Sequence, residues 1–148
     1  MQISLFDGGQ KFKIDKTIRL LEMFGGYGSQ SLALKYLGKS FEHHLLSEWA
    51  VPSIQAYKDL HFGEDDTDYS ASLSDLEIVD FLDGRISRDY QTPMTREQII
   101  RQGESWQRKI YNNMRASHNL GSIMKIKGGD LDITETDKYC YMLTYSFP

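Results

Sequence analysis

An apolar segment that runs directly into a cluster of glycines constrains the fold of this chain more than any other feature. Residues 17–24 (TIRLLEMF) are apolar over most of their length, which is typical of a strand covered on both faces of a parallel sheet. Residues 25–28 then supply three glycines, and residues 29–37 place leucines among good helix formers. A strand, a glycine turn and a helix in this order predict a parallel α/β fold.

The alternation continues along the rest of the chain. Residues 41–47 are predicted as a second strand, and Pro52 suits the first turn of a helix over residues 53–60. A turn is expected at Gly8-Gly9, before the first strand. The remaining expected elements are a helix at 74–82 behind a Ser cap, a long helix that starts at the capping box of Thr95 and is disturbed at Gly103, and strands at 122–126 and 139–145.

Composition excludes several classes of protein. The chain has 148 residues, of which 40% are apolar and 26% charged, which is ordinary for one globular domain. Its net charge of −4 provides no overall positive field for nucleic acid. A single cysteine, Cys140, excludes a disulfide framework and suits a reducing compartment. Because no apolar run reaches the roughly twenty residues of a membrane span, we expect a soluble, cytoplasmic protein with no membrane partner.

Charge is distributed unevenly within that total. Residues 59–92 carry a net charge of −8, whereas residues 95–127 carry +5. Two interpretations of the basic stretch stay open, since its side chains either contact DNA phosphates or form an ordinary solvated helix face. The basic residues of its helical part are Arg96, Arg101, Arg108, Lys109 and Arg115.

The glycine cluster and a later acid point to one kind of chemistry. Glycines after a strand let the backbone approach a ligand, and the following helix offers free N–H groups. Glu48 lies twenty residues after Gly28, where an acid can accept both ribose hydroxyls of a bound nucleoside. Trp49 follows at once and can stack on an adenine. A plain turn followed by a solvated acid is the alternative explanation.

The same residues resemble a known family. The segments IRLLEMFGGYGSQSLALKYLG and SEWAVPSIQAY are similar to the first two motifs of the DNA cytosine-5 methyltransferases. Gly129-Asp130-Leu131 resembles the third motif, and residues 144–148 resemble the approach to the catalytic Phe-Pro-Cys-Gln motif. The resemblance covers residues 18–62 and 128–148, and the stretch between them has no counterpart in the family that we identify.

This resemblance implies a fold and a domain organisation. The expected fold is α/β, the Rossmann-like fold of S-adenosylmethionine-dependent methyltransferases, with a partial parallel sheet, flanking helices and a largely helical insertion. In that fold the strand order runs 3-2-1-4, and residues 139–145 are strand 4. The chain is then a single partial catalytic domain over residues 1–148, with a core at 17–62 and 122–148 and an insertion at 63–121.

The resemblance also implies a cofactor, S-adenosylmethionine, and the residues that hold it. The loop after the first strand supports the methionine part, Glu48 holds the ribose, Trp49 packs on adenine, and Asp130 with Leu131 meets the base edge. The site residues implied in this way are Phe24, Gly25, Gly26, Tyr27, Gly28, Ser29, Glu48, Trp49, Asp130, Leu131 and Pro148. The full-length enzyme is expected to transfer a methyl group to cytosine carbon 5 of DNA, in a restriction-modification or phage context. This chain alone is expected to be inactive, because it stops before the nucleophilic cysteine.

Other chemistry-bearing side chains have structural explanations. His43 and His44 alternate on a strand, so their rings point apart and do not share a metal ion. The acids at 65–68 lack the glycine and final glutamate of a calcium loop. Cys140 lies in mid-strand and is expected to be a small buried apolar residue. We therefore expect neither a metal site nor a catalytic residue in this chain.

Two alternatives to the methyltransferase fragment remain. One is a non-catalytic binding module with the same fold, or a partner subunit of a split enzyme. The other is a piece of a Rossmann-type dehydrogenase, which is disfavoured because Ser31 stands where the third glycine of that fingerprint belongs. If the chain has a methyltransferase fold, the uncharged strand at 139–145 leaves one edge of the sheet unpaired. We expect this edge to be covered, either by a second copy of the chain in a homodimer or by the insertion.

Overall fold

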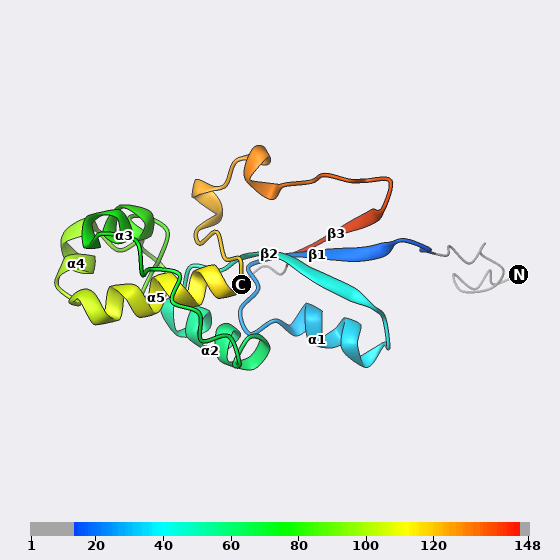
Figure 1. Cartoon of the computed structure of the whole chain (residues 1–148), viewed down its shortest axis with the longest axis horizontal. Helices are drawn as coiled ribbons and strands as arrows, with labels where there is room; N and C mark the ends of the chain where they lie inside the picture. The colour runs from blue at the N-terminus through cyan, green and yellow to red at the C-terminus, as the bar shows by residue number, and fades with distance from the viewer. Residues whose placement is uncertain (1–13, 146–148) are drawn as a thin grey trace, which may run out of the picture.

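Within the described part of the chain, three parallel strands form a sheet in the order β2-β1-β3 (Figure 1). The computed structural model describes residues 14–145, so the expected turn at Gly8-Gly9 and the predicted site residue Pro148 lie outside the described residues. The elements of the sheet part are β1 (Thr17–Met23), α1 (Ser29–Tyr36), β2 (Phe41–Ser47), α2 (Val51–His61) and β3 (Tyr139–Tyr145). The predicted alternation of strand, helix, strand and helix over residues 17–61 is confirmed, and β3 lies beside β1 as expected for strand 4.

The pairing of β1 with β2 has a local irregularity at the two histidines. Leu20 is paired with His43 but Leu21 with Leu45, so His44 is an extra residue in the register. The His43 ring bonds to the carbonyl of Ser117 at 2.8 Å, whereas the His44 ring bonds to the carbonyl of Leu131 at 3.0 Å. The two rings therefore contact different elements, as the alternation of strand residues predicted.

A second part of the molecule is helical and comprises α3 (Asp75–Leu82), α4 (Arg96–Ile100) and α5 (Glu104–Ala116) (Figure 1). Capping boxes at Ser74 and Thr95 begin the first two helices, because each side chain accepts the N–H three residues later. The long helix expected from Thr95 is two helices. Gly103 separates them with a φ of 83°, which the α-helix does not allow. The core residues of this part are Ile54, Ile78, Val79, Leu82, Ile86, Met94, Ile99, Ile110 and Met114.

The helical part is joined to the sheet at the carboxyl end of β2. The Leu46 N–H donates to the His118 carbonyl, and the Leu120 N–H donates to the Leu46 carbonyl. Ala50 and Ser87 form a further parallel bridge. Because Ile54 of α2 also belongs to the helical core, α2 is packed between the two parts.

The prediction of a strand over residues 122–126 is wrong. This stretch contains a short 3-10 helix, η1 (Ile123–Lys125), and is followed by a second one, η2 (Gly128–Leu131). The Ser122 hydroxyl accepts the Met124 N–H at 3.4 Å and starts the turn, so the apolar residues that follow do not extend into a strand. The residues that do pair with the outer edge of β2 are 118–120.

The side of the sheet at β3 is the least covered. Leu143 and Tyr145 expose 50% and 60% of their surfaces, and Cys140 is half-buried rather than fully buried as expected. Within residues 14–145 no strand pairs with the outer edge of β3. The expected homodimer stays a prediction. In this same described stretch no helix has both the length and the apolar character needed to cross a membrane.

Candidate functional site

The glycine loop between β1 and α1 is shaped by close packing as well as by backbone conformation. A β-carbon on Gly25 would lie 2.3 Å from the side chain of Leu46 on β2. One on Gly28 would lie 2.3 Å from the His61 ring of α2. Gly26 meets no such obstacle but has a φ of 53°, which favours glycine. The loop therefore favours glycine at Gly25 and Gly28 for space, and at Gly26 and at Gly28, whose φ is 79°, for conformation.

Glu48, at the carboxyl end of β2, holds this loop directly. One carboxylate oxygen accepts the Gly26 N–H at 2.9 Å, and the other accepts the Ala50 N–H at 2.7 Å. The side chain is almost fully buried, with 9% of its residue surface exposed. A carboxylate offers about four lone-pair sites, so two remain for a ligand. This geometry suits an acid that accepts hydroxyl groups from a bound molecule.

A cavity of about 400 Å³ opens beside Glu48. Its volume falls within the roughly 300–1,000 Å³ of small-molecule sites, and its walls combine aromatic and apolar side chains with a few polar groups, as such sites do. The residues that line it are Phe24, Gly26, Ser47, Glu48, Trp49, Ser53, Tyr90, Gly121, Ser122, Ile123 and Met124. Both parts of the molecule contribute to this wall, since Tyr90 and Gly121 come from the segment 63–121.

Asn119 connects the two parts at the cavity. Its side-chain amide donates to the Glu48 carbonyl at 2.9 Å, and its side-chain oxygen accepts the Glu48 N–H at 3.0 Å. The same oxygen accepts the Gly121 N–H at 2.9 Å. Ser47 donates its hydroxyl to the Gly121 carbonyl at 2.9 Å. These bonds fix the backbone of Glu48 against the 119–122 segment, so the acid is held from both sides.

A buried hydrogen-bond network lies beneath the loop. Glu22 of β1 has no exposed surface and accepts the Ser31 N–H at 3.2 Å, the Ser31 hydroxyl at 2.9 Å and the Tyr57 hydroxyl at 2.5 Å. The Tyr57 hydroxyl also lies 3.2 Å from Nδ1 of His43. The N-cap residue of α1 is Gly28, which has no side chain to accept a hydrogen bond from the first turn of the helix. Glu22 takes over this role, because it accepts the Ser31 N–H in that turn.

Burial sets the titration of this network. Removal from water raises the pKa of Tyr57 well above its usual range, and the neighbouring Glu22 charge raises it further. Burial also lowers the pKa of His43, partly opposed by its bond to the Ser117 carbonyl and by the Glu22 charge. Tyr57 therefore stays a hydroxyl donor, and the neutral form of His43 is favoured.

The structure brings some of the predicted site residues together and leaves others apart. Phe24, Gly26, Glu48 and Trp49 line one cavity. The other members of the loop have supporting positions: Gly25 and Gly28 pack against β2 and α2, Tyr27 is 58% exposed with its carbonyl bonded to His61, and Ser29 begins α1.

Asp130 and Leu131 do not reach this cavity. The Asp130 carboxylate accepts the Lys127 N–H at 2.7 Å and caps η2. Leu131 lines a neighbouring hollow of about 480 Å³, which shares Phe24 and Ile123 with the cavity. The cavity wall nearest in sequence is formed by Gly121, Ser122, Ile123 and Met124, and the role expected of Asp130 and Leu131 stays a prediction.

Three contributors to the site were missed from the sequence. Glu22 sits in an apolar strand, where its spacing gives no sign of a partner in α2. Tyr90 adopts a φ of 63°, which is uncommon for an aromatic residue and is not readable from composition. The segment 121–123 repeats the Gly-polar-apolar pattern of residues 129–131, and residues 84–86 repeat it as well, so a search for that pattern has three matches in this chain. Only the fold distinguishes them.

Comparison with known proteins relates the chain to a methyltransferase. No protein-family model matches the chain. Over 135 residues, 90% of its length, the chain is 33% identical to the orphan methyltransferase M.SssI of Spiroplasma monobiae. The match covers 34% of that relative, so the chain spans about a third of the length of the curated protein it matches.

The match extends over most of the chain, so it includes at least part of the segment 63–121, and the division of the chain into a core and an insertion stays a prediction. The parallel sheet with its flanking helices and the similarity to M.SssI agree with each other. The fold is the Rossmann-like α/β fold of methyltransferases, and the similarity supports a methyltransferase family for this chain.

Proposed function

We propose that the cavity beside Glu48 binds S-adenosylmethionine, and that the chain is the cofactor-binding part of a DNA cytosine-5 methyltransferase. The observation that carries this proposal is the position of Glu48. Its carboxylate is buried at the carboxyl end of β2, is held by the backbone of Gly26 and Ala50, and keeps acceptor sites beside a cavity of suitable size.

Each wall of the cavity suits a different part of that cofactor. Glu48 accepts the two ribose hydroxyls, in place of water. Trp49 and Tyr90 line the same cavity and offer aromatic faces to the adenine ring. The backbone of the 121–123 segment meets the edge of the base, a role that the sequence assigned to Asp130. The glycine loop lies under the methionine part, where a larger side chain would collide with α2 or β2.

S-adenosylmethionine supplies the methyl group in this family, and the residues described here bind and orient it. Cys140 is not positioned to attack a pyrimidine, the covalent step of the cytosine-5 family. It is paired with Ile18 near the amino end of β3, whereas the cavity lies at the carboxyl ends of β1 and β2. We therefore expect no covalent adduct between Cys140 and DNA that contains 5-fluorocytosine.

Calorimetric titration with S-adenosylhomocysteine tests the cofactor assignment. Glu48→Ala removes the acceptor and is expected to weaken binding by at least about tenfold, because a hydrogen bond to a charged group contributes roughly 1.5–3 kcal/mol. Glu42→Ala, an exposed acid on the same strand, is the matched control and is expected to bind like the wild type.

A further variant separates binding from folding. Glu48→Gln keeps one acceptor oxygen and is expected to bind with intermediate affinity, at a thermal midpoint close to that of the wild type. Absence of heat from the wild-type chain at millimolar ligand, or equal affinities for wild type and Glu48→Ala, would count against the proposal.

A further inference from the structure

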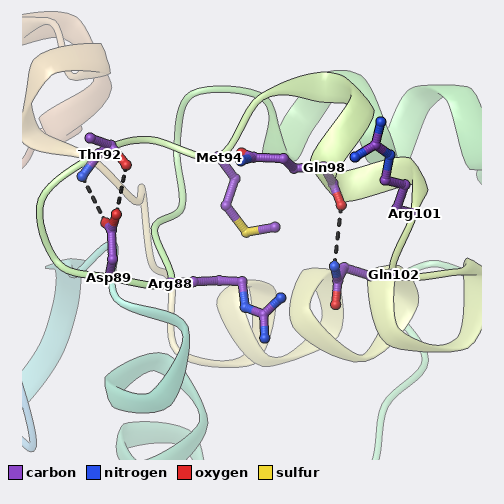
Figure 2. A pocket seen from close by; sticks show the side chains of 7 residues that line it. All are labelled: Arg88, Asp89, Thr92, Met94, Gln98, Arg101 and Gln102. Atoms are coloured by element: carbon purple, nitrogen blue, oxygen red, sulfur yellow. Dashed lines mark hydrogen bonds between the residues drawn. The ribbon is translucent and has the colours of Figure 1, made fainter.

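A second pocket, of about 250 Å³, lies in the helical part and differs in chemistry from the cofactor cavity (Figure 2). Two arginines, Arg88 and Arg101, line it together with two glutamines of α4 and the residues just after it, and Met94 is nearly buried beneath them. The full lining is Arg88, Asp89, Thr92, Met94, Gln98, Arg101 and Gln102. All except Met94 present polar groups that bind anions or water rather than an apolar ligand.

The positive charge of this pocket is not compensated within the described chain. In residues 14–145 the arginines that form ion pairs are Arg19, Arg96 and Arg108, and neither Arg88 nor Arg101 has a carboxylate within ion-pair distance. Arg96 is paired with Asp80, and Arg108 with Asp75 and Glu104. The structure thus divides the basic residues into those that hold the fold together and those that remain available.

Asp89 is the one acid in the pocket lining, and its carboxylate is already engaged. It accepts the N–H groups of Gln91 and Thr92 at 2.9 and 2.8 Å and the hydroxyls of Ser87 and Thr92 at 3.0 and 2.8 Å. Figure 2 shows this carboxylate turned onto Thr92. Two guanidinium groups against one engaged carboxylate leave the pocket with a net positive charge.

The arginine pocket adjoins the cofactor cavity through one short loop. Arg88 and Asp89 line the pocket, and Tyr90, the next residue, lines the cavity. Consecutive Cα atoms are about 3.8 Å apart, so Arg88 and Tyr90 cannot be separated by more than about 7 Å along the chain. A nucleic acid that reaches the cavity with a base to be methylated brings its own phosphates to this neighbourhood, since each strand carries one every ~3.4 Å.

We propose that Arg88 and Arg101 together bind a backbone phosphate of duplex DNA beside the cofactor cavity. This proposal rests on the proposed function, because it takes its substrate from there. Guanidinium groups match the geometry of phosphate oxygens and stay charged at every relevant pH. With a net charge of −4, the chain has no general attraction for DNA, so a local cluster must provide the contact.

The test compares two double variants that lose the same charge. Arg88→Ala/Arg101→Ala removes the charge of the pocket, whereas Lys35→Ala/Lys58→Ala removes two lysines that lie outside it. Fluorescence anisotropy of a labelled duplex is recorded from 50 to 200 mM salt. The arginine variant is expected to bind the duplex about tenfold more weakly than the wild type. The slope of its log affinity against log salt concentration is expected to be smaller in magnitude by about 1, which corresponds to one lost phosphate contact. The lysine variant is expected to bind like the wild type.

Three results would overturn the proposal. The first is an equal loss of duplex affinity in the two double variants. The second is no binding of duplex by the wild type at 50 mM salt. The third is a ³¹P titration in which binding of inorganic phosphate requires the two arginines although binding of duplex does not. The last result would assign the pocket to a free phosphate. Calorimetry with S-adenosylhomocysteine on the arginine variant keeps this test separate from the proposed function, because cofactor affinity is expected to be unchanged there.

Discussion

The sheet part and the helical part of this molecule are stabilised in different ways. The helical part has a core of nine buried apolar residues contributed by α2, α3, α4, α5 and the loops between them. The smaller apolar cluster beside the sheet comprises Leu21, Met23 and Leu45, with partly buried neighbours such as Tyr141. The sheet part instead buries polar groups beneath its glycine loop, where Glu22 bonds to Ser31 and Tyr57.

This difference shows that the segment 63–121 is more than an addition to a methyltransferase core. It supplies the packing that fixes α2, and through Asn119 it holds the backbone of Glu48. It also supplies Tyr90 and Gly121 to the cavity wall. The proposed cofactor site therefore lies where the two parts meet, and contacts from both parts hold its residues in place.

The largest change in the free energy of unfolding is expected from a substitution that creates a cavity in the helical core. Ile78→Ala removes a fully buried side chain of α3 and is expected to lower the free energy of unfolding by about 2–5 kcal/mol. Leu76→Ala, on the same helix but 64% exposed, is expected to change it by no more than about 0.5 kcal/mol. Urea denaturation followed by circular dichroism measures both. Similar losses for the two variants would show that the helical part lacks the packed core described.

A smaller loss is expected from the polar network of the sheet part. Glu22→Gln keeps the shape of the side chain but replaces an acceptor of three hydrogen bonds by an amide that also donates. The expected destabilisation is about 1.5–3 kcal/mol, accompanied by weaker binding of S-adenosylhomocysteine because the loop loses its support. Glu42→Gln serves as the exposed control. Unchanged stability in Glu22→Gln would contradict a structural role for the buried carboxylate.

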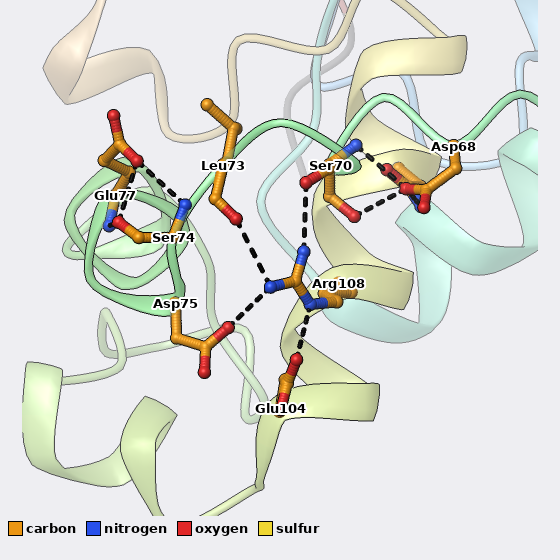
Figure 3. Close-up of polar contacts among 9 residues, drawn as sticks. Asp68, Ser70, Leu73, Ser74, Asp75, Glu77, Glu104 and Arg108 are labelled. Atoms are coloured by element: carbon orange, nitrogen blue, oxygen red, sulfur yellow. Dashed lines mark hydrogen bonds and ion pairs between the residues drawn. The ribbon is translucent and has the colours of Figure 1, made fainter.

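Arg108 shows how the helical part uses charge outside its core. Its guanidinium donates to the carbonyls of Ser70 and Leu73 and to the carboxylates of Asp75 and Glu104 (Figure 3). Because these bonds tie the loop before α3 to α5, Arg108→Ala is expected to lower the thermal midpoint measurably. Arg101→Ala, which breaks no ion pair within residues 14–145, is expected to leave the midpoint unchanged. Scanning calorimetry on the two variants gives the comparison, and equal midpoints would remove the distinction between the two arginines.

The smallest effect is expected from pH, and it belongs to the sheet part. Burial lowers the pKa of His43 in the folded chain below the ordinary value of about 6.5. As the pH falls, His43 therefore binds a proton in the unfolded chain before it does so in the folded chain. Stability is therefore expected to be full above about pH 6.5 and to fall as the pH drops below it. The charged groups that act on His43 are Glu22, His61 and His118.

A variant isolates this contribution. His43→Asn removes the titrating ring and is expected to flatten the dependence of stability on pH between about 5 and 7, whereas His118→Asn, in an exposed position, is expected to retain it. Denaturation midpoints at half-unit pH intervals provide the measurement. A slope that survives in His43→Asn would assign the effect to another group.

Much of the fold was predictable because its signals are local. An apolar run that ends at glycines predicted the first strand, and the Ser cap at Ser74 and the capping box at Thr95 marked helix starts that the structure confirms. The strand predicted over 122–126 failed for a tertiary reason. Ser122 bonds to its own neighbouring backbone and is also held by the Arg85 carbonyl, so a stretch with apolar residues forms a turn against the helical part.

The candidate site was predictable only where its residues follow strands directly. Phe24, Gly26, Glu48 and Trp49 each stand at the carboxyl end of a predicted strand, and all four line the cavity. Tyr90 reaches the same cavity through a loop whose conformation depends on the four bonds to Asp89. No periodicity reports that arrangement, which is why this residue was missed.

The two tryptophans of the chain provide the most direct test of the central claim, since one lies in each part. Trp49 lines the proposed cofactor cavity, whereas Trp106 packs against the helical core. In a ¹⁵N-labelled sample their indole N–H groups give two signals, assigned by Trp49→Phe and Trp106→Phe. Titration with S-adenosylhomocysteine is predicted to shift the Trp49 signal saturably and to leave the Trp106 signal in place. A saturable shift of Trp106 alone, or no shift of Trp49 at millimolar ligand, would contradict the cofactor site proposed at Glu48.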